Sequence, residues 1–522
     1  MSKKILLSVV LVLVCTVCIA GCTGPFVEAY NVPMIDLDGG VIMAGGVPEN
    51  DTLYTFDSAA LDKYAEMFAH KTIVADKDDF GKDYMAHPDS ILLRRKKAGT
   101  DTFEFTEEVL TVFPLAHGKG PLKAKISTDG GLTYPMEGTL QNTPKSWERS
   151  QETPTIYRLT FTPDNKPSDD DMLVMVSGCP YWAKSQDFPE LPRNGFNVSL
   201  SSPSIDEATG DSVEGREWTE FETWYGHGKD AGNENTVVRN PLGKNAHDCI
   251  VAMSALTRLK DPVTHEWKNE WMGLFHDRKH DCYKTILSFR EPEAGNTYPT
   301  YKVCGKDMVM EWSEPVKYFD NYSSIEHKSK MCEVECIRSD RGEGNKLAII
   351  TRSNAKNMNS LISFSEDEGA TWSEPKEVPF ALSGERHKAE WVKDNKGNDK
   401  LFITFRSIER SSDKRSKYKK SKWMSEGYVA WLGSWDDLEK GSEGDFRVKI
   451  AHTYHDGQNE IDRDAHADTG YCGNVVLPNG KVATCSYGRF SPANDPMRGG
   501  TTYIAGRVID VAGLYDLITL AK

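Results

Sequence analysis

An eight-residue pattern occurs twice in the chain in nearly the same form. It reads STDGGLTY over residues 127–134 and SEDEGATW over residues 365–372, and each copy directly follows an apolar run typical of a strand. Ser and Asp side chains bond nearby backbone N–H groups, and Gly adopts the positive φ that a tight corner needs. The aromatic residue at the end covers the corner against its own sheet. The pattern therefore predicts two equivalent hairpin corners, and such repeats indicate a fold built from similar units.

Three weaker versions of this corner accompany the two strong ones. The five marker serines lie 69 to 87 residues apart, at Ser127, Ser201, Ser288, Ser365 and Ser434. Four short strands with their turns need roughly 40–50 residues, so this spacing leaves room for long loops in each unit. A further unit from residue 471 to about residue 511 brings the number of units to six. The spacing thus predicts an all-β, six-bladed β-propeller, with two stacked sandwiches as the alternative.

The repeated pattern resembles the Asp box of the sialidase (neuraminidase) family of β-propellers. The segment SGERHKA over residues 383–389 looks like a motif of a divergent bacterial branch of these Asp-box, or BNR-repeat, proteins. The resemblance implies a six-bladed propeller with Asp-box turns over residues 76–522. Residues 22–75 precede it as an N-terminal segment, with one helix expected over residues 58–71. The extended run Lys71–Val74 is the strand expected to close the last blade.

The N-terminus has the features of an export signal. Lys3 and Lys4 precede an apolar run, and the segment ends in Ile-Ala-Gly-Cys at Cys22. The run is too short for a membrane-spanning helix and fits a secretory signal. Its ending resembles the cleavage box of bacterial lipoproteins, which implies a signal peptide over residues 1–21. Cys22 would then carry a lipid anchor in the outer membrane or at the cell surface; a plain signal peptide is the alternative.

Composition excludes some partners and leaves others open. The net charge is −15 at pH 7 and no basic stripe is present, so we expect no nucleic-acid partner. Eight of the 11 cysteines lie beyond the export signal, an even number that permits disulfides in an exported protein. Free buried thiols are an equally good alternative. No spacing suggests zinc, and the acidic segment 462–468 lacks the Gly turn and terminal Glu of a calcium loop; we expect no metal and no cofactor.

Counting strands backwards from each corner places a set of polar residues at one rim of the propeller. If the corner joins the third and fourth strands of a blade, the opposite rim carries the starts of first strands and the ends of second strands. The residues predicted there are His87, His117, His276, Glu333, Arg352, Glu385, Arg386, His387, Arg406 and Tyr471. Guanidinium groups in such a funnel suit a carboxylate ligand. For Arg352 and Arg406 taken singly, an ordinary exposed strand end is the alternative.

The family resemblance assigns catalytic roles to two of these residues. The segment 333–352 resembles the Glu-strand-turn-strand-Arg unit of sialidases, and the segment 471–489 resembles the one that carries their nucleophilic tyrosine. The resemblance implies that Tyr471 attacks the anomeric carbon while Glu333 takes its proton. A neutral tyrosine suits a carbon that bears a carboxylate, because an anionic nucleophile would be repelled.

The chain departs from the sialidase pattern at two positions. The arginine expected at the start of the first blade is missing and His87 stands there; the expected acid/base aspartate is also missing, and His117 occupies its region. Histidine can act as a general acid near neutral pH, so His117 is the third expected catalytic residue. The residues expected to bind substrate are Arg352, Arg386, Arg406, His87, His387 and His276.

Two functions fit this set of residues. One is an exo-acting glycoside hydrolase that releases sialic acid or a related acidic sugar from glycans. The other is a non-catalytic surface lipoprotein that binds such glycans in the same funnel, and the fold alone does not distinguish them. The joint presence of Tyr471, Glu333 and Arg352 favours the enzyme, whereas the missing arginine and aspartate favour the binding protein.

Overall fold

The computed structural model describes most of the chain, and the fold is given for those residues alone. They are residues 32–45, 52–69, 71–117, 121–149, 153–178, 195–225, 237–239, 249–277, 279–319, 331–353, 358–409, 424–454 and 469–521. The expected signal peptide, Cys22, Cys179 and the acidic segment 462–468 lie outside these ranges, so lipidation of Cys22 stays a prediction. Within the described ranges, no helix has both the length and the apolar character needed to cross a membrane.

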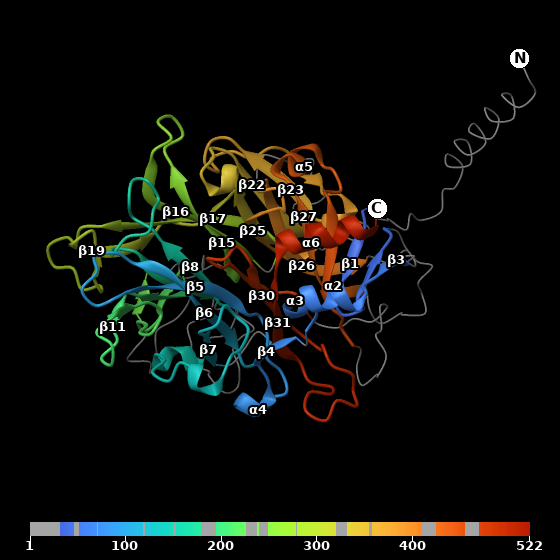
Figure 1. Cartoon of the computed structure of the whole chain (residues 1–522). Helices are drawn as coiled ribbons and strands as arrows, with labels where there is room; N and C mark the ends of the chain where they lie inside the picture. Colours follow the sequence, from blue (N-terminus) through green and yellow to red (C-terminus); the bar gives the residue numbers. More distant parts are fainter. Residues whose placement is uncertain are drawn as a thin grey trace, which may run out of the picture.

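The described strands form six sheets, numbered here in chain order (Figure 1). The first contains β5 (Asp89–Lys96), β6 (Glu104–Pro114), β7 (Leu122–Ser127), β11 (Ser204–Ile205) and β12 (Ser212–Val213). The second contains β8 (Thr155–Leu159), β9 (Met172–Gly178), β10 (Phe196–Ser201), β13 (Glu222–Trp224) and β14 (Val237–Arg239). The third contains β15 (Ile250–Lys260), β16 (Trp267–His276), β17 (Cys282–Arg290), β18 (Tyr301–Val303), β19 (Lys306–Trp312) and β20 (Val316–Lys317).

The other three sheets complete the arrangement. The fourth contains β21 (Met331–Arg338), β22 (Leu347–Ser353), β23 (Leu361–Ser365) and β24 (Lys376–Glu377). The fifth contains β25 (Gly384–Lys393), β26 (Asp399–Glu409), β27 (Met424–Gly433), β28 (Phe446–Ala451), β1 (Met34–Asp36), β2 (Val41–Met43) and β3 (Thr52–Thr55). The sixth contains β29 (Cys472–Val476), β30 (Val482–Gly488), β31 (Tyr503–Ile509) and β4 (Thr72–Ala75).

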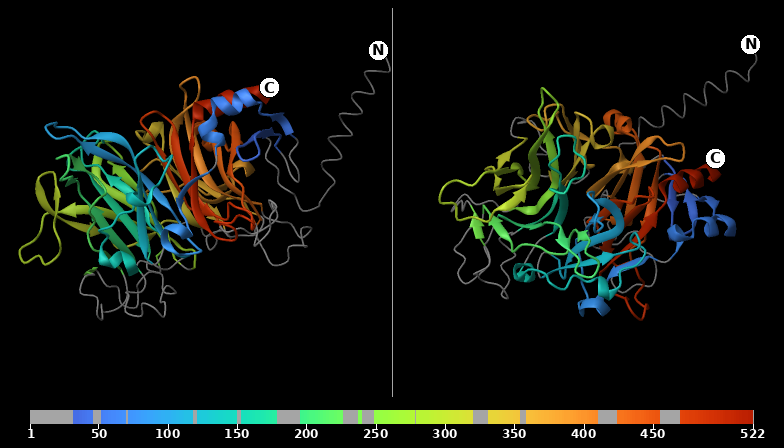
Figure 2. Two further views of the ribbon diagram at one scale, coloured as in Figure 1. Left: turned by 60° about the horizontal axis from the view of Figure 1, so that its bottom comes forward. Right: turned by 60° about the vertical axis from the view of Figure 1, so that its left-hand side comes forward.

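The first strands of successive sheets contact one another around a common axis. β5 contacts β8, β8 contacts β15, β15 contacts β21, β21 contacts β25, β25 contacts β29, and β29 contacts β5. Two further views show the sheets following one another around the molecule, so that the red last sheet returns to the blue first one (Figure 2). The prediction of an all-β fold with a propeller-like arrangement is confirmed. These six first strands are called the inner strands below.

The two strong copies of the repeated pattern form corners with the same hydrogen bonds. Ser127 Oγ donates to Asp129 Oδ1 over 2.7 Å and accepts from the Gly131 N–H over 2.9 Å. In the second copy, Ser365 Oγ donates to Asp367 Oδ1 over 2.8 Å. The first corner follows β7 and the second follows β23, which are the third strands of their sheets in chain order. The pattern therefore produces the same local structure in two sheets, because its side chains supply the bonds themselves.

The N-terminal segment belongs to two sheets at opposite sides of one seam. β4 pairs antiparallel with β31, in the register Ile504↔Ala75 and Gly506↔Thr72, so it is the outer strand of the sixth sheet. β1 pairs parallel with β28 and extends the fifth sheet through β2 and β3. This extension was not predicted.

Short helices complete the described fold. They are α2 (Ser58–Lys63), α3 (Ala65–Phe68), α4 (Lys77–Phe80), α5 (Trp435–Lys440) and α6 (Val511–Ile518). Five 3₁₀ turns span residues 136–138, 145–149, 340–342, 380–382 and 519–521. The single helix expected over residues 58–71 is divided, because Tyr64 has non-helical backbone angles (φ −115°, ψ 35°) and ends α2.

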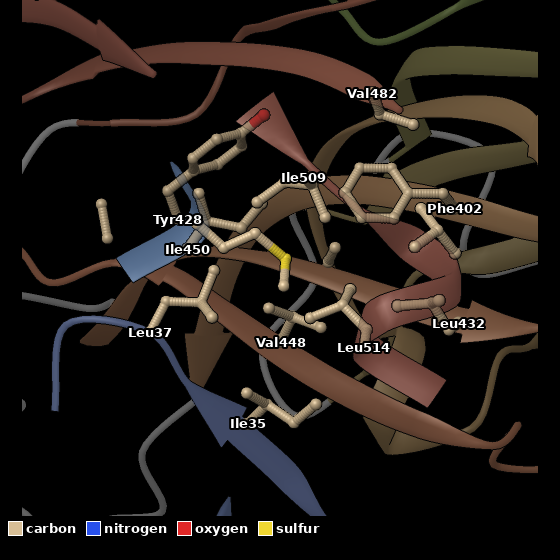
Figure 3. Packing of buried hydrophobic residues seen from close by; sticks show 14 of the residues in the cluster. Ile35, Leu37, Phe402, Tyr428, Leu432, Val448, Ile450, Val482, Ile509 and Leu514 are labelled. Atoms are coloured by element: carbon tan, nitrogen blue, oxygen red, sulfur yellow. The ribbon is translucent and has the colours of Figure 1, made fainter. Parts of the chain in front are cut away.

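A core between the fifth and sixth sheets fixes the N-terminal segment (Figure 3). Ile35 from β1 is fully buried with Val448 from β28, Ile509 from β31 and Leu514 from α6. Burying side chains of this size contributes about 1.5–3 kcal/mol each. The N-terminal strands and α6 are therefore held to the propeller by apolar packing as well as by strand pairing.

No disulfide joins any two of the described cysteines. They are Cys249, Cys282, Cys304, Cys332, Cys336, Cys472 and Cys485, and all but Cys304 and Cys336 are buried. Of the two alternatives left open by the cysteine count, free thiols hold for this part of the chain.

Candidate active site

Several inner strands begin with a residue in a left-handed backbone conformation. His87 has φ +47°, Met253 +50°, Glu333 +45° and Arg386 +58°. The ladder shifts register around Glu333 and around Arg386, as at a β-bulge. Such conformations cost about 1–3 kcal/mol for non-glycine residues and cluster at functional sites, and bulges redirect side chains. Four inner strands thus carry strained residues at the rim where the polar set was predicted.

Tyr471 and Glu333 form a hydrogen bond across the axis. Tyr471 directly precedes β29 of the sixth sheet and Glu333 lies in β21 of the fourth. The Tyr471 hydroxyl donates to Glu333 Oε1 over 2.6 Å, and both residues are buried. The two sheets are not neighbours in the ring, so the bond depends on both inner strands reaching the same point of the axis.

Glu333 belongs to a continuous network of charged groups. Arg352 Nη1 donates to both carboxylate oxygens of Glu333, over 2.9 and 3.0 Å. Arg352 Nε lies 3.0 Å from Glu385 Oε1, and the other Glu385 oxygen pairs with Arg406. Glu385 is 1 % exposed and bridges two of the three arginines that were expected to bind a carboxylate. These two arginines are positioned by protein carboxylates rather than standing as free strand ends.

The surroundings of Glu333 determine its ionisation. Burial raises its pKa, but the Arg352 charge and the hydrogen bonds from Tyr471 and Arg352 outweigh burial and lower the pKa to about 2. The same pair raises the pKa of Arg352 well above its usual value, against the effect of burial. Glu333 is therefore a carboxylate at neutral pH and accepts the tyrosine proton in a hydrogen bond.

Arg386 lies against the face of the candidate nucleophile. Its guanidinium carbon is 5.1 Å from the centre of the Tyr471 ring. Its Nη1 donates to the Ser254 carbonyl over 3.3 Å, and the side chain is buried. A cation over a phenol ring attracts its electrons and favours negative charge on the oxygen. Arg386 is thus placed to stabilise charge that develops on Tyr471.

The cluster has a surplus of positive charge. Its formal charges come from three guanidinium groups and two carboxylates: Arg352, Arg386, Arg406, Glu333 and Glu385. One positive charge is left over in a site where desolvation strengthens electrostatic interactions. Such a site favours a ligand with one negative charge.

Aromatic rings and histidines form a second side of the site. The His87 ring centre lies 4.3 Å from that of Tyr471, 4.7 Å from that of His117 and 5.1 Å from that of Tyr487. The Tyr84 hydroxyl is 3.3 Å from His117 Nδ1. His87 is buried, whereas His117 is exposed. The His87 ring therefore lies between His117 and Tyr471, and His117 is on the side open to solvent.

The remaining two histidines of the predicted set are enclosed and neutral. His276 Nδ1 donates to the Asp277 carbonyl, and His387 Nε2 donates to the Leu382 carbonyl, both over 2.8 Å. Burial lowers the pKa of each imidazole to about 4. The charge of Glu333 acts on His276, which lies near the network. His387 is 0 % exposed and packs on Phe405, so no part of its surface is open to a ligand.

Glu385 is predicted at the rim from the sequence, but with no catalytic or binding role. Glu385 lies directly opposite Arg406 in the β25–β26 ladder, as Cys332 lies opposite Arg352 in the β21–β22 ladder. Direct cross-strand partners have side chains close enough to pair. The register of the hairpin, read from the sequence, would have identified Glu385 as the partner of Arg406.

Comparison with known proteins gives similarity in structure only. No family model matches the sequence, and no curated protein is similar to it. The α-L-arabinofuranosidase Arb93A from Fusarium graminearum has a TM-score of 0.45 at 10% identity, covering 85% of this chain and 98% of that chain. A protein of unknown function from Dyadobacter fermentans DSM 18053 has a TM-score of 0.43 at 13% identity, with 85% and 98% covered. Trypanosoma rangeli sialidase has a TM-score of 0.40 at 12% identity; the match covers 84% of this chain and only 57% of that one.

Proposed function

We propose that the protein is an exo-acting glycoside hydrolase of the sialidase type, which releases sialic acid or a related acidic sugar from glycans. The observation that carries the proposal is the 2.6 Å hydrogen bond from the Tyr471 hydroxyl to Glu333 inside an arginine cluster. Tyrosine has an ordinary pKa of about 10 and needs a base and nearby cations to act as a nucleophile. Glu333, Arg352 and Arg386 are positioned to supply both.

The reaction begins with attack of Tyr471 Oη on the anomeric carbon. As the carbon–oxygen bond forms, the phenol proton moves to Glu333 and the bond to the leaving sugar oxygen breaks. His117, on the open side, gives its proton to that oxygen. Water then attacks the same carbon and gives one of its protons to His117, while Tyr471 leaves and Glu333 returns the phenol proton to it. The surplus positive charge of the arginines holds the substrate carboxylate throughout.

The low pKa of Glu333 determines the order of these events. The Arg352 charge that lowers the pKa of Glu333 makes it a weak base toward a phenol, whose ordinary pKa is about 10. A free tyrosinate is therefore not formed before attack. The proton moves while the new bond forms, and Arg386 over the ring stabilises the charge at that moment.

We further infer that the six sheets are the blades of a six-bladed propeller and that the corners at 127–134 and 365–372 are Asp boxes. The ring of contacts between inner strands supports the first inference, and the repeated hydrogen bonds support the second. A lipid anchor on Cys22 would hold the enzyme at the outer membrane or cell surface, where glycans are accessible.

The second candidate function is a glycan-binding surface lipoprotein without catalysis. One observation favours it: Glu385 already pairs with both Arg352 and Arg406, so part of the positive charge is balanced within the protein. The sequence has no aspartate or glutamate in the segment 109–128, which contains His117, and this points in the same direction.

The experiment that decides between the two uses purified protein and a panel of glycosides. The panel contains sialyllactose and glycosides of uronic acids and other keto acids, and released sugar is measured. Release of an acidic sugar supports the hydrolase. Saturable binding of these glycans without release, under the same conditions, assigns the protein to the binding class.

A further inference from the structure

A separate cavity lies deeper along the propeller axis than the candidate active site. Its volume is about 510 Å³, and residues from β5, β8, β21, β25 and β29 line it. Glu335 lies two residues beyond Glu333 on β21, and Lys388 lies two residues beyond Arg386 on β25. Two residues of a strand span about 7 Å. The cavity is thus one step further along the same inner strands, away from Tyr471.

The polar groups of this cavity are unequally paired. Lys388 forms an ion pair with Asp89. Glu335 Oε1 accepts a 3.2 Å hydrogen bond from the Ala389 N–H. The carboxyl group of Glu390, on the same strand as Lys388, has neither a hydrogen bond nor an ion pair with any residue that the structure describes. One cation is therefore matched by its own carboxylate, while two further carboxyl groups face the cavity with one backbone N–H between them.

Both of these carboxyl groups are held away from their charged form. Burial raises the pKa of Glu335 to about 7 and of Glu390 to about 8, and the charge of Asp89 adds to both shifts, whereas Lys388 opposes them. The other charged or titratable groups that face them are Asp89 from β5, Tyr157 and Arg158 from β8, and Arg386 from β25. A further positive charge in the cavity would restore the charged form of both carboxyl groups.

Apart from Ser90, Tyr157, Arg158 and Asn474, the rest of the cavity wall is apolar, and it reaches the surface. Ile91, Ile156, Val475 and Val476 line it, and so does Phe105, which is 45% exposed and marks the mouth. A volume of this size accommodates a small organic ligand. The wall therefore suits a ligand whose body is apolar and whose one polar end meets the two carboxyl groups.

We propose that this cavity binds a small organic cation, a primary ammonium group on an apolar body, with the ammonium between Glu335 and Glu390. An anion is disfavoured because Lys388 is paired with Asp89 and Arg158 with Glu214. A metal ion is disfavoured because the described residues contain no group of three His, Cys, Asp or Glu side chains arranged to hold one.

Benzylamine is a suitable probe, with benzyl alcohol and benzoate as neutral and anionic analogues of similar shape. Each is titrated into the full-length protein by isothermal calorimetry at pH 7.5. We expect benzylamine to bind at least tenfold more tightly than either analogue. We also expect the measured heat to differ between buffers of different ionisation enthalpy, because Glu390 loses a proton when the cation arrives.

Glu390→Gln is the decisive variant, since the amide cannot become charged when the cation arrives and the change breaks no side-chain bond that the described structure contains. It should weaken benzylamine binding at least tenfold, whereas Glu137→Gln, at an exposed glutamate on the surface, should leave it unchanged. The proposal is overturned if benzylamine gives no binding up to about 10 mM, if benzoate binds as tightly, or if Glu390→Gln binds benzylamine like the unchanged protein.

Discussion

The rim and the deeper cavity place glutamates of the same strand in opposite electrostatic surroundings. At the rim, Glu333 lies among arginines and its pKa falls to about 2. One step further along the same strand, burial raises the pKa of Glu335 to about 7, and the charges of Lys388 and Arg386 oppose the shift only in part. Both glutamates are largely removed from water, so burial alone does not decide their ionisation. The comparison shows that a direct ion pair outweighs burial at Glu333, whereas burial prevails at Glu335, which forms no ion pair with a described residue.

The largest expected effect comes from removing one oxygen at the rim. Tyr471→Phe should lower turnover of an acidic glycoside by at least about a thousandfold, because the nucleophile is lost, while binding of the same glycan remains. Release of sugar and binding are measured on one preparation. The matched control is Tyr503→Phe in the same sixth sheet, whose hydroxyl meets Ser491 over 2.6 Å; it should stay active. Full activity of Tyr471→Phe would remove the basis of the proposed mechanism.

Removing the principal cation at the rim should make Glu333 behave more like Glu335. Arg352→Ala leaves a buried carboxylate without its partner, and such losses cost about 3–5 kcal/mol. The free energy of unfolding from urea titration at pH 7 should fall by that order, and the pKa of Glu333 should rise. Arg341→Ala, at an arginine whose side chain is 57% exposed, serves as the control. An unchanged unfolding free energy in Arg352→Ala would mean that Glu333 is solvated or otherwise compensated.

Removing a carboxyl group from the deeper cavity should stabilise the protein at high pH. The pKa of Glu390 is raised to about 8 in the folded state and is about 4.3 in an unfolded chain. Between these values the unfolded state loses the proton and the folded state keeps it, so stability falls as pH rises. Glu390→Gln should therefore gain about 1–3 kcal/mol at pH 8.5 and little at pH 4.5, as measured by urea unfolding. A gain of the same size in Glu137→Gln would show that the effect is not specific to the cavity.

The smallest expected effect concerns the neutral histidine beside the network. Burial lowers the pKa of His276 to about 4, against about 6.5 in an unfolded chain. As pH falls between these values, the unfolded state takes up a proton and the folded state does not, so stability is lost with falling pH. His276→Asn should flatten the decline between pH 6.5 and 4 by about 1–2 kcal/mol. The exposed His265→Asn should leave the slope as it is, and an equal change there would contradict the assignment.

The propeller-like arrangement was predictable because the corner pattern supplies its own hydrogen bonds and recurs at regular spacing. The strand β4 was also recognisable, as the extended run Lys71–Val74. The extension by β1–β3 was not, because strands of three or four residues are too short to show an alternating pattern and β1 pairs with a strand far away in the sequence. The division of the expected helix at Tyr64 reflects tertiary packing, since its hydroxyl bonds Asp516 of α6.

The candidate site was predictable as a set of residues but not as a network. Counting strands placed Tyr471, Glu333 and Arg352 at one rim, and they lie together. The bulges that turn Glu333 and Arg386 inward depend on positive φ angles. Such angles could not be predicted from the sequence, because neither residue is a glycine. His387 lies near the start of its strand as predicted, but its ring is enclosed at the bulge and cannot contact a ligand. Side-chain direction at such positions depends on the ladder around them.

The seam of the ring has a consequence for how the protein is made. β4 pairs with β31, whose residues are more than 400 positions later in the chain. β1 likewise pairs with β28, which is synthesised much later. A chain that emerges from its N-terminus therefore exposes these strand edges until almost the last residue has been synthesised. Contacts of such long range form slowly, and unpaired edges invite association with other chains. During synthesis, the earliest segment of the protein must remain unpaired the longest, and its dependence on chaperones should exceed that of any internal sheet.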